Sequence, residues 1–217
     1  KKDQSMMSNI NIKGTANIVN ACLEYKVKKL GHISSVAAIG RKGDGEYSET
    51  NSWVESSDNS FYAISKSKAE NEVWRGIQEG LQAVIVNPGI IIGPSTWNRS
   101  STNLFKKISS GLSFYPTGLN GFVDVKDVSN STIELMKSSL CSQRYILVAE
   151  NLSYESVFKT IAKSLNVKPP SNAASFGLMS LGWRMEYLKS LVTRKSPKIT
   201  KETARTASQK NFYNNQK

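Results

Sequence analysis

The chain has 217 residues and a net charge of +12, from 29 Lys and Arg against 17 Asp and Glu. This length fits one domain or slightly more, and a hydrophobic content of 39% is ordinary for a globular protein, which excludes a disordered chain. No apolar run is long enough to span a membrane, and the first residues do not form a signal peptide. We therefore expect a globular protein with no membrane partner.

Histidine and cysteine are too scarce for the usual metal sites. A zinc site with three or four such ligands would need the single His and both Cys, and their spacing matches no ligand pattern. Cys22 and Cys141 are isolated and are predicted to be reduced, buried side chains. We expect no metal, no disulfide framework and a cytoplasmic location.

Positive charge gathers at the end of the sequence. Residues 184–217 carry nine basic and two acidic side chains, so +7 of the +12 lies in that stretch. No RNA-binding aromatic motif, helix-turn-helix signature or zinc finger accompanies it. Charge alone is weak evidence, so we expect a solvated basic C-terminal face and no nucleic-acid partner.

The front of the chain alternates helices with strands. Apolar side chains recur at i, i+3, i+4 and i+7 and predict one helix face made of Ile18, Ala21, Cys22 and Tyr25. Residues 30–35 follow as a short strand that ends in hydroxyl side chains.

A polar, Gly-rich segment over residues 40–60 predicts a surface loop, in which Arg41 and Lys42 are expected to be solvated. A long helix follows, capped by Ser60 or Asn59 and ended by Gly80.

The next strand, 83–86, is continuously apolar and β-branched, as in a parallel sheet. Helix–strand–helix–strand is the pattern of a doubly wound α/β fold of the Rossmann type. We expect half of such a domain over residues 1–94.

The pattern loosens after Pro94, and residues 95–217 are predicted to form a mostly helical region with a basic helical C-terminus. Strands are expected near 122–125 and 145–148, and Ser153 and Thr200 are expected to cap helices. The apolar stretch from Phe176 to Leu191 is predicted to pack into the core.

The segment from Phe61 to Glu70 carries the chemistry. Tyr62 and Lys66 are four residues apart, so on a helix they share one face. A Lys ammonium beside a phenol stabilises the phenolate, and such a Tyr can give or take a proton at a carbonyl or alcohol group. The pair alone is a weak signal, because it arises often by chance.

Its neighbours strengthen the signal. The strand before the pair ends in Ser34 and Ser35, and the strand after it ends in Asn87-Pro88-Gly89. Open α/β sheets place their ligands at this carboxyl edge, so a hydroxyl, the Tyr–Lys pair and a rigid turn are expected to meet there.

Other arrangements are less favoured. His32 and Ser34 lie on one side of a strand, but no nucleophile elbow and no third acidic member support a hydrolase. Asp124 and Asp127 are expected at a strand end and in a helix cap, not as a catalytic carboxylate pair.

Five segments in order resemble the extended short-chain dehydrogenases/reductases, also called the NAD-dependent epimerase/dehydratase family. The resemblance covers about residues 5 to 165 and is closest to the dihydroflavonol-reductase-like branch. The segments are Asn11 to Asn17, Ile33 to Gly40, Tyr62 to Lys66, Asn87 to Pro94 and Phe122 to Val128.

The resemblance implies a role for each matching position. Ser35 would hydrogen-bond the substrate oxygen, Tyr62 would be the general acid/base, and Lys66 would bind the nicotinamide ribose. Asn11 would support that end of the cofactor pocket, which Pro88, Ile91 and the Tyr62–Lys66 pair would line. The implied cofactor is NAD or NADP, which carries the hydride.

One departure is large. The family's glycine fingerprint for the dinucleotide phosphates is absent from these residues, and so is the side chain that selects NAD or NADP. We expect that the N-terminal part of the Rossmann domain is missing and that this chain alone binds no dinucleotide tightly, while the activity of the chain alone stays open.

The sequence therefore favours an NAD(P)-dependent oxidoreductase of the extended short-chain type, acting at a carbonyl or hydroxyl carbon of a small molecule. A nucleotide-sugar epimerase or dehydratase stays open, as does a non-catalytic NAD(P)-fold binding or regulatory protein. The resemblance implies that residues 95–217 form the substrate-binding region. It makes Trp97, Asn98, Phe105 and Phe114 candidates for a substrate pocket there, and core or loop packing explains each of them equally well. Substrate residues remain unassigned, and a homodimer is compatible with the sequence.

Overall fold

A computed structural model describes residues 2–57, 59–96, 101–193 and 200–217. Its α-helices are α1 (Lys2–Ser8), α2 (Gly14–Glu24), α3 (Phe61–Gln78), α4 (Thr102–Ser109), α5 (Val125–Lys137), α6 (Tyr154–Ser164), α7 (Phe176–Thr193) and α8 (Lys201–Ser208). A π-helical turn η1 (Asn9–Lys13) joins α1 to α2, and a 3₁₀ turn η2 (Val36–Ile39) follows the first strand.

Ten short strands complete the described part of the chain. They are β1 (Leu30–Ile33), β2 (Gly45–Tyr47), β3 (Ala83–Pro88), β4 (Ile90–Ile92), β5 (Phe114–Pro116), β6 (Leu119–Asp124), β7 (Gln143–Leu147), β8 (Glu150–Ser153), β9 (Asn172–Ala174) and β10 (Asn211–Tyr213). None of the helices in the described ranges is long and apolar enough to cross a membrane.

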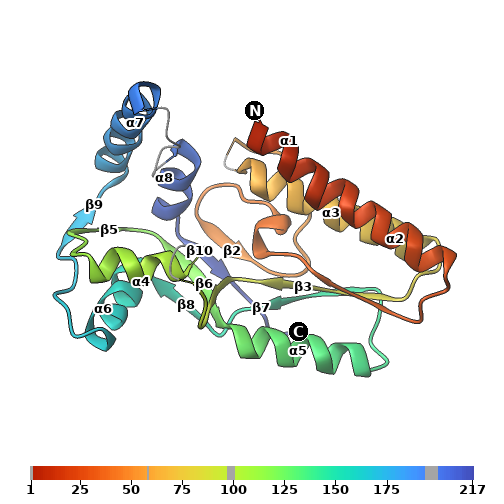
Figure 1. Cartoon of the computed structure of the whole chain (residues 1–217). Helices are drawn as coiled ribbons and strands as arrows, with labels where there is room; N and C mark the ends of the chain where they lie inside the picture. Colours follow the sequence, from red (N-terminus) through yellow and green to blue (C-terminus); the bar gives the residue numbers. More distant parts are fainter. Residues whose placement is uncertain (1, 58, 97–100, 194–199) are drawn as a thin grey trace.

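The central sheet is parallel, with strand order β1-β3-β7. Helices α2 and α3 cover one face and α5 covers the other (Figure 1). Every residue of β3 is buried, as expected for the middle strand of a covered parallel sheet. The predicted Rossmann-like doubly wound arrangement is confirmed.

Local signals fix the ends of α3 as predicted. The Ser60 hydroxyl accepts a hydrogen bond from the Ala63 N–H at 3.1 Å, which caps the helix. The helix ends two residues before Gly80, whose φ of 100° is a left-handed conformation that glycine adopts without strain. Ser153 and Thr200 cap their helices in the same way, as predicted, whereas Asp124, and not Asp127, caps α5.

The buried face of α2 differs from the prediction. Val19 and Cys22 pack on α3 and β3, whereas Ile18 and Tyr25 are exposed. The face of α2 that carries Val19 turns toward α3 because Gly76 of α3 has no side chain and leaves room for Val19. A Cβ at Gly76 would lie 2.5 Å from the Val19 side chain.

A second group of elements lies to the left in Figure 1. Strand β6 pairs with β4 in parallel and with β8 in antiparallel, and helices α4 and α6 pack on this sheet. Ile108, Phe122 and Phe158 are buried in its core. Strand β7 was expected in the region after residue 94, yet it pairs with β3 in the central sheet, and the division at residue 94 stays a prediction.

The segment from 40 to 60 is not simply a surface loop. It contains β2, which pairs in parallel with β10 at the end of the chain. Tyr47 and Tyr213 pack against each other with ring centroids 5.9 Å apart. Arg41 was predicted to be solvated but has only 9% of its surface exposed, because this strand pairing covers it; Lys42 is exposed, as predicted.

The apolar stretch predicted to pack into the core forms α7 instead. Leu181, Met185 and Leu188 are more than half exposed. Helix α7 contacts α8 and β9 and lies away from the two three-stranded sheets (Figure 1). Its apolar side chains therefore cannot reach the core of either of these sheets.

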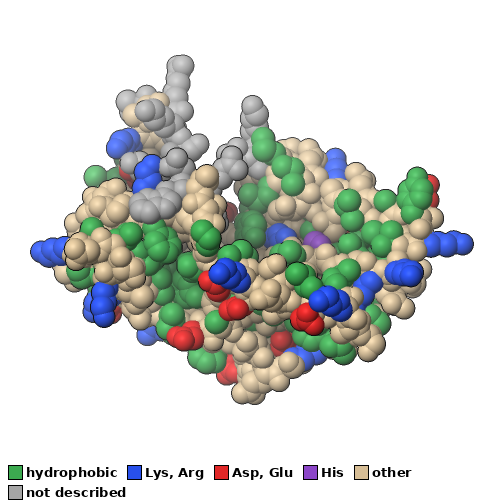
Figure 2. Space-filling view, turned by 60° about the horizontal axis from the view of Figure 1, so that its bottom comes forward, with side chains coloured by type: hydrophobic (Ala, Val, Ile, Leu, Met, Phe, Trp, Pro, Cys, Tyr) green, Lys and Arg blue, Asp and Glu red, His purple; other side chains and the backbone are tan. Residues whose placement is uncertain are grey.

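Both cysteines are free; Cys22 is buried as predicted, whereas the prediction is wrong for Cys141, which is only half-buried. Charged side chains are scattered over the face drawn in Figure 2, with acidic residues among the basic ones. In the C-terminal stretch, Lys201, Lys210 and Lys217 are exposed as expected, whereas Arg194, Lys195 and Lys198 lie outside the described residues.

Candidate active site

A cavity of about 900 Å³ lies where β1 and β3 end, between the central sheet and the C-terminal helices. The residues after β1, the start of α3 and the turn after β3 form one wall. Helices α7 and α8 contribute the opposite wall. Most of the lining is apolar, and Figure 2 shows hydrophobic side chains gathered around a hollow in the molecule.

Four of the six predicted site residues line this cavity, namely Ser35, Tyr62, Pro88 and Ile91. Lys66 and Asn11 lie behind the wall. Of the proposed pocket residues, Phe114 lines the cavity and Phe105 packs against the core under α4 and α6. Trp97 and Asn98 lie outside the described residues.

Tyr62 is the second residue of α3, and the Ser60 cap fixes the start of that helix at the cavity. Its side chain is 44% exposed, and its hydroxyl bonds to no described residue. The Ser35 hydroxyl accepts from the Ala37 N–H at 3.2 Å and so caps η2. Its proton remains available to donate, so both hydroxyls can meet a ligand in the cavity.

Lys66 lies one turn after Tyr62 on α3. Its ammonium donates to the Ile33 carbonyl at 2.9 Å, at the end of β1. Burial lowers the pKa of Lys66 from its usual value, while the nearby Glu70 carboxylate acts in the opposite direction.

Asn11 acts on α3 rather than on the cavity. Its side-chain amide donates to the Ser65 hydroxyl at 3.0 Å, and that hydroxyl donates to the Tyr62 carbonyl at 2.8 Å. Asn11 therefore ties η1 to the first turn of the helix that carries Tyr62.

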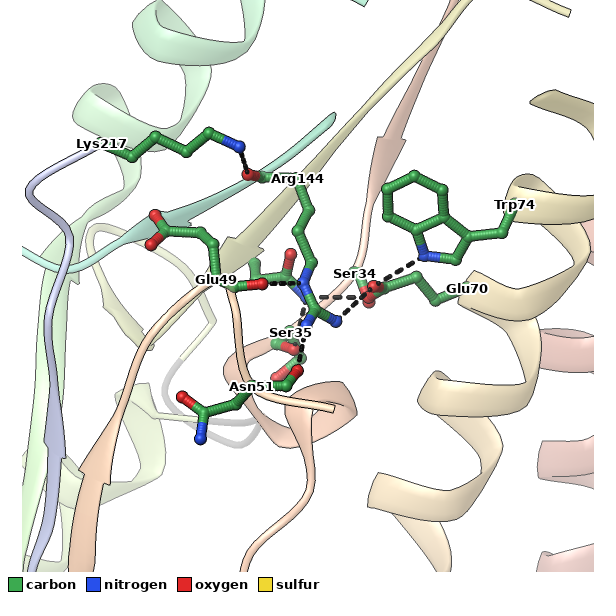
Figure 3. Close-up of polar contacts among 9 residues, drawn as sticks. Ser34, Ser35, Glu49, Asn51, Glu70, Trp74, Arg144 and Lys217 are labelled. Atoms are coloured by element: carbon green, nitrogen blue, oxygen red, sulfur yellow. Dashed lines mark hydrogen bonds and ion pairs between the residues drawn. The ribbon is translucent and has the colours of Figure 1, made fainter. Parts of the chain in front are cut away.

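A buried carboxylate, Glu70, organises the wall behind the two serines (Figure 3). Its Oε2 accepts from the Ser34 hydroxyl and from the Asn87 amide, each at 2.8 Å. The same Asn87 amide also donates to the Ser35 carbonyl at 3.0 Å. Glu70 thus links α3 to the ends of β1 and β3.

The other oxygen of Glu70 faces a cation. Arg144 of β7 donates through Nη1 to Glu70 Oε1 at 3.2 Å, and Trp74 donates to the same oxygen at 3.3 Å. Figure 3 shows the Arg144 guanidinium between α3 and the loop at Glu49 and Asn51, whose carbonyls accept its remaining donors. This network holds the strand ends that carry the cavity wall.

This network was not predicted from the sequence. The spacing of Glu70 could have indicated its place near the site, because it stands four residues after Lys66 and eight after Tyr62 and so shares their helix face. No sequence feature indicates the role of Arg144, because its contact with Glu70 depends on the pairing of β7 with β3.

The residues at this edge suit the nicotinamide and ribose end of a dinucleotide. Tyr62 lines the cavity, Pro88 and Ile91 offer an apolar wall, and the Lys66 ammonium has protons left for ribose hydroxyls. The phosphate fingerprint is not among the 217 residues, so the fit concerns this end of the cofactor alone.

A parallel sheet with helices on both faces defines the class as Rossmann-type α/β proteins, and a Tyr-x-x-x-Lys pair lies at the carboxyl edge of this sheet. The model of the NAD dependent epimerase/dehydratase family matches residues 1–141. The chain belongs to this family, which is NAD(P)-dependent.

Curated relatives are reductases by name. The chain is 30% identical to "Putative dihydroflavonol 4-reductase" of Synechocystis sp., over 98% of the chain and 64% of that protein. It is also 30% identical to cinnamoyl-CoA reductase CAD2 of Medicago truncatula, over 74% of the chain and 53% of that protein. The chain thus spans about half to two thirds of the length of these relatives.

Solved structures agree on the fold. The crystal structure of gox2253 matches with a TM-score of 0.79 and 28% identity, over 99% of this chain and 66% of that one. UDP-glucuronic acid 4-epimerase of Bacillus cereus, in complex with NAD, matches with a TM-score of 0.69, over 80% of this chain and 58% of that one. Its identity is only 20%, so this likeness shows the fold alone.

Proposed function

We propose that this chain forms the catalytic end of an NAD(P)-dependent reductase that converts a carbonyl group of a largely apolar small molecule into an alcohol. The observation that carries the proposal is that the hydroxyls of Ser35 and Tyr62 belong to one predominantly apolar cavity. The reductase names of the curated relatives support the same direction.

In this proposal Ser35 donates a hydrogen bond to the carbonyl oxygen and so orients the substrate. Tyr62 gives its proton to that oxygen as the negative charge develops there. Lys66 stabilises the phenolate that remains and binds ribose hydroxyls, and Pro88 and Ile91 pack against the nicotinamide. A bound NAD(P)H would supply the hydride.

The cavity wall favours a reductase over a nucleotide-sugar epimerase. A sugar substrate presents hydroxyls on all sides and needs many polar partners, because each unpaired buried hydroxyl carries a free-energy cost. Phe114, Leu178, Leu181 and Met185 offer none. We also propose a cytoplasmic location, supported by the two free cysteines.

The test is Tyr62→Phe in the intact protein, with NADPH and NADH oxidation followed against a panel of aryl and alkyl ketones and aldehydes. We expect kcat to fall by at least about a hundredfold, since general acid–base catalysis contributes at least that much. The matched control is Tyr25→Phe, an exposed tyrosine at the end of α2, which should leave kcat unchanged.

Unchanged circular dichroism and melting temperature of Tyr62→Phe would show that the fold is intact. Wild-type protein that binds the cofactor but oxidises it with no carbonyl compound would support the non-catalytic alternative. Turnover that survives in Tyr62→Phe would contradict the assigned role.

A further inference from the structure

The cavity carries positive charge without any matching negative charge. Arg41 and Lys107 line it, and none of the described lining residues is Asp or Glu. Lys107 is exposed at the surface, whereas Arg41 is 9% exposed and lies inside the wall. The buried charge of the cavity is therefore that of one guanidinium.

The Arg41 guanidinium is incompletely bonded. Its Nη2 donates to the Tyr213 hydroxyl at 3.1 Å, but its Nε is buried without a hydrogen-bond partner. Its Nη1 bonds to no described residue, and none of the ion pairs found among the described residues includes Arg41. A buried cation without a counter-ion is unfavourable, because it has lost its water without gaining a negative partner.

The backbone fixes Arg41 in this place. Gly40 has a φ of 85°, a left-handed turn that leads the chain inward, and Trp53 lies 3.1 Å from where a Cβ on Gly40 would be. The Arg41 N–H then donates to the Asn59 side chain at 2.9 Å. The neighbouring β2–β10 pairing brings Tyr213 under the guanidinium.

Polar side chains surround the cation on the cavity side. Asn120 and Tyr154 are buried, both line the cavity, and Asn120 lies close enough to the Tyr154 phenol to act on its pKa. The charge of Arg41 is close enough to act on the phenols of Tyr154 and Tyr213 and to lower their pKa values, although burial has the larger, opposite effect. We call Arg41, Asn120, Tyr154 and Tyr213 the polar corner.

We propose that the polar corner binds a carboxylate on the substrate, so that the substrate class is an apolar carbonyl compound that carries a carboxylate group. The guanidinium donates charge-assisted hydrogen bonds to the carboxylate oxygens, and the apolar lining takes the body of the molecule. Arg41 is then a specificity-determining residue. This inference rests on the proposed function for the identity of the pocket as the substrate site.

A carboxylate fits better than a phosphate dianion. The polar corner has one buried cation with few free donors, and the planar guanidinium matches a planar carboxylate. A nucleotide diphosphate would place further charge against apolar wall residues such as Leu178 and Phe114.

The test compares two probes that differ in one charge, 6-oxo-6-phenylhexanoate and its methyl ester. Binding to the intact protein is measured by calorimetry without cofactor, so no turnover is needed. We expect the acid to bind the wild type at least about tenfold more tightly than the ester, as a charge-assisted hydrogen bond in a buried site can provide.

Arg41→Met should reduce the ratio of the two affinities to about one, and Arg41→Lys should retain part of it. The matched control is Lys107→Met, which removes the exposed cation of the same cavity and should leave the ratio unchanged. Tyr62→Phe should also keep the ratio, which separates this inference from the proposed chemistry.

Equal affinities of acid and ester for the wild type would overturn the inference even if Arg41→Met failed to fold. A ratio that survives in Arg41→Met, or that disappears in Lys107→Met instead, would overturn it as well. Loss of turnover in every assay combined with an intact acid preference would refute the proposed function and leave the carboxylate site standing.

Discussion

The Glu70–Arg144 pair permits the sharpest stability prediction. The side chains are 3% and 16% exposed, so water compensates little when one charge is removed. Glu70→Gln keeps the shape of the side chain but leaves the Arg144 cation buried without its partner. Breaking such a pair on one side costs about 3–5 kcal/mol, and the partial exposure of Arg144 favours a loss of about 3 kcal/mol.

The assay is urea unfolding followed by tryptophan fluorescence and circular dichroism. Glu134→Gln is the matched control, because Glu134 pairs with Lys137 on the exposed face of α5 and both side chains are mostly solvated. Its effect should stay below about 0.5 kcal/mol. Adding Arg144→Met to Glu70→Gln should recover part of the loss, since no uncompensated charge then remains.

If Glu70→Gln destabilised the protein by no more than Glu134→Gln does, the network would not hold the strand ends as described. An undiminished loss in the double variant would instead show that the hydrogen bonds from Ser34 and Asn87, rather than the ion pair, dominate the contribution of Glu70.

Two further predictions concern His32 and the glycines. Burial, helped by the Lys66 charge, lowers the pKa of His32 from 6.5 to about 4, so between these values only the unfolded chain takes up the proton. The free energy of unfolding should therefore fall by up to about 3 kcal/mol as the pH drops from 7 to 4. His32→Asn should lack this part of the loss when unfolding by urea is measured at each pH. If the free energies of unfolding of the wild type and of His32→Asn fell in parallel with pH, this prediction would be wrong. Gly89→Ala should destabilise the protein and narrow the cavity, because the new Cβ would lie 2.4 Å from the Gly121 carbonyl oxygen. In Gly182→Ala, in α7, the new Cβ meets nothing within 4 Å, so this variant should be neutral or more stable by up to about 1 kcal/mol. Equal melting temperatures of the two variants would refute this contrast.

Features that depend on local chemistry were predictable from the sequence. A hydroxyl before an amphipathic run fixes a helix start whatever surrounds it, and Ser60, Ser153 and Thr200 cap as expected. The Tyr62–Lys66 spacing and the buried β3 strand are local in the same sense. The parallel pairing of β1 with β3 follows as well, because a helical crossover joins these two strands, whereas the place of β7 beside β3 does not.

Features that depend on pairing between distant segments were not predictable. Arg41 looks like an ordinary loop cation until β10, about 170 residues later, covers it. Helix α7 has the composition of a core helix, and its exposure follows from its position beside α8, outside both sheets. No local feature of the sequence indicates either the burial of Arg41 or the exposure of α7.

Strand β7 shows why the carboxyl edge of the central sheet cannot be assigned to residues 1–94 alone. Ser34, Ser35 and Asn87 belong to that part, but the carboxylate that fixes Ser34 and Asn87 is Glu70, and the cation beside Glu70 comes from Arg144 of β7. Without β7, Glu70 would be a buried anion with neutral donors only, and β3 would be an apolar edge strand. The cavity residues that follow β1 and β3 therefore depend for their position on β7, which comes after α4 and β6 in the chain, so we expect this wall to form only when both parts fold together.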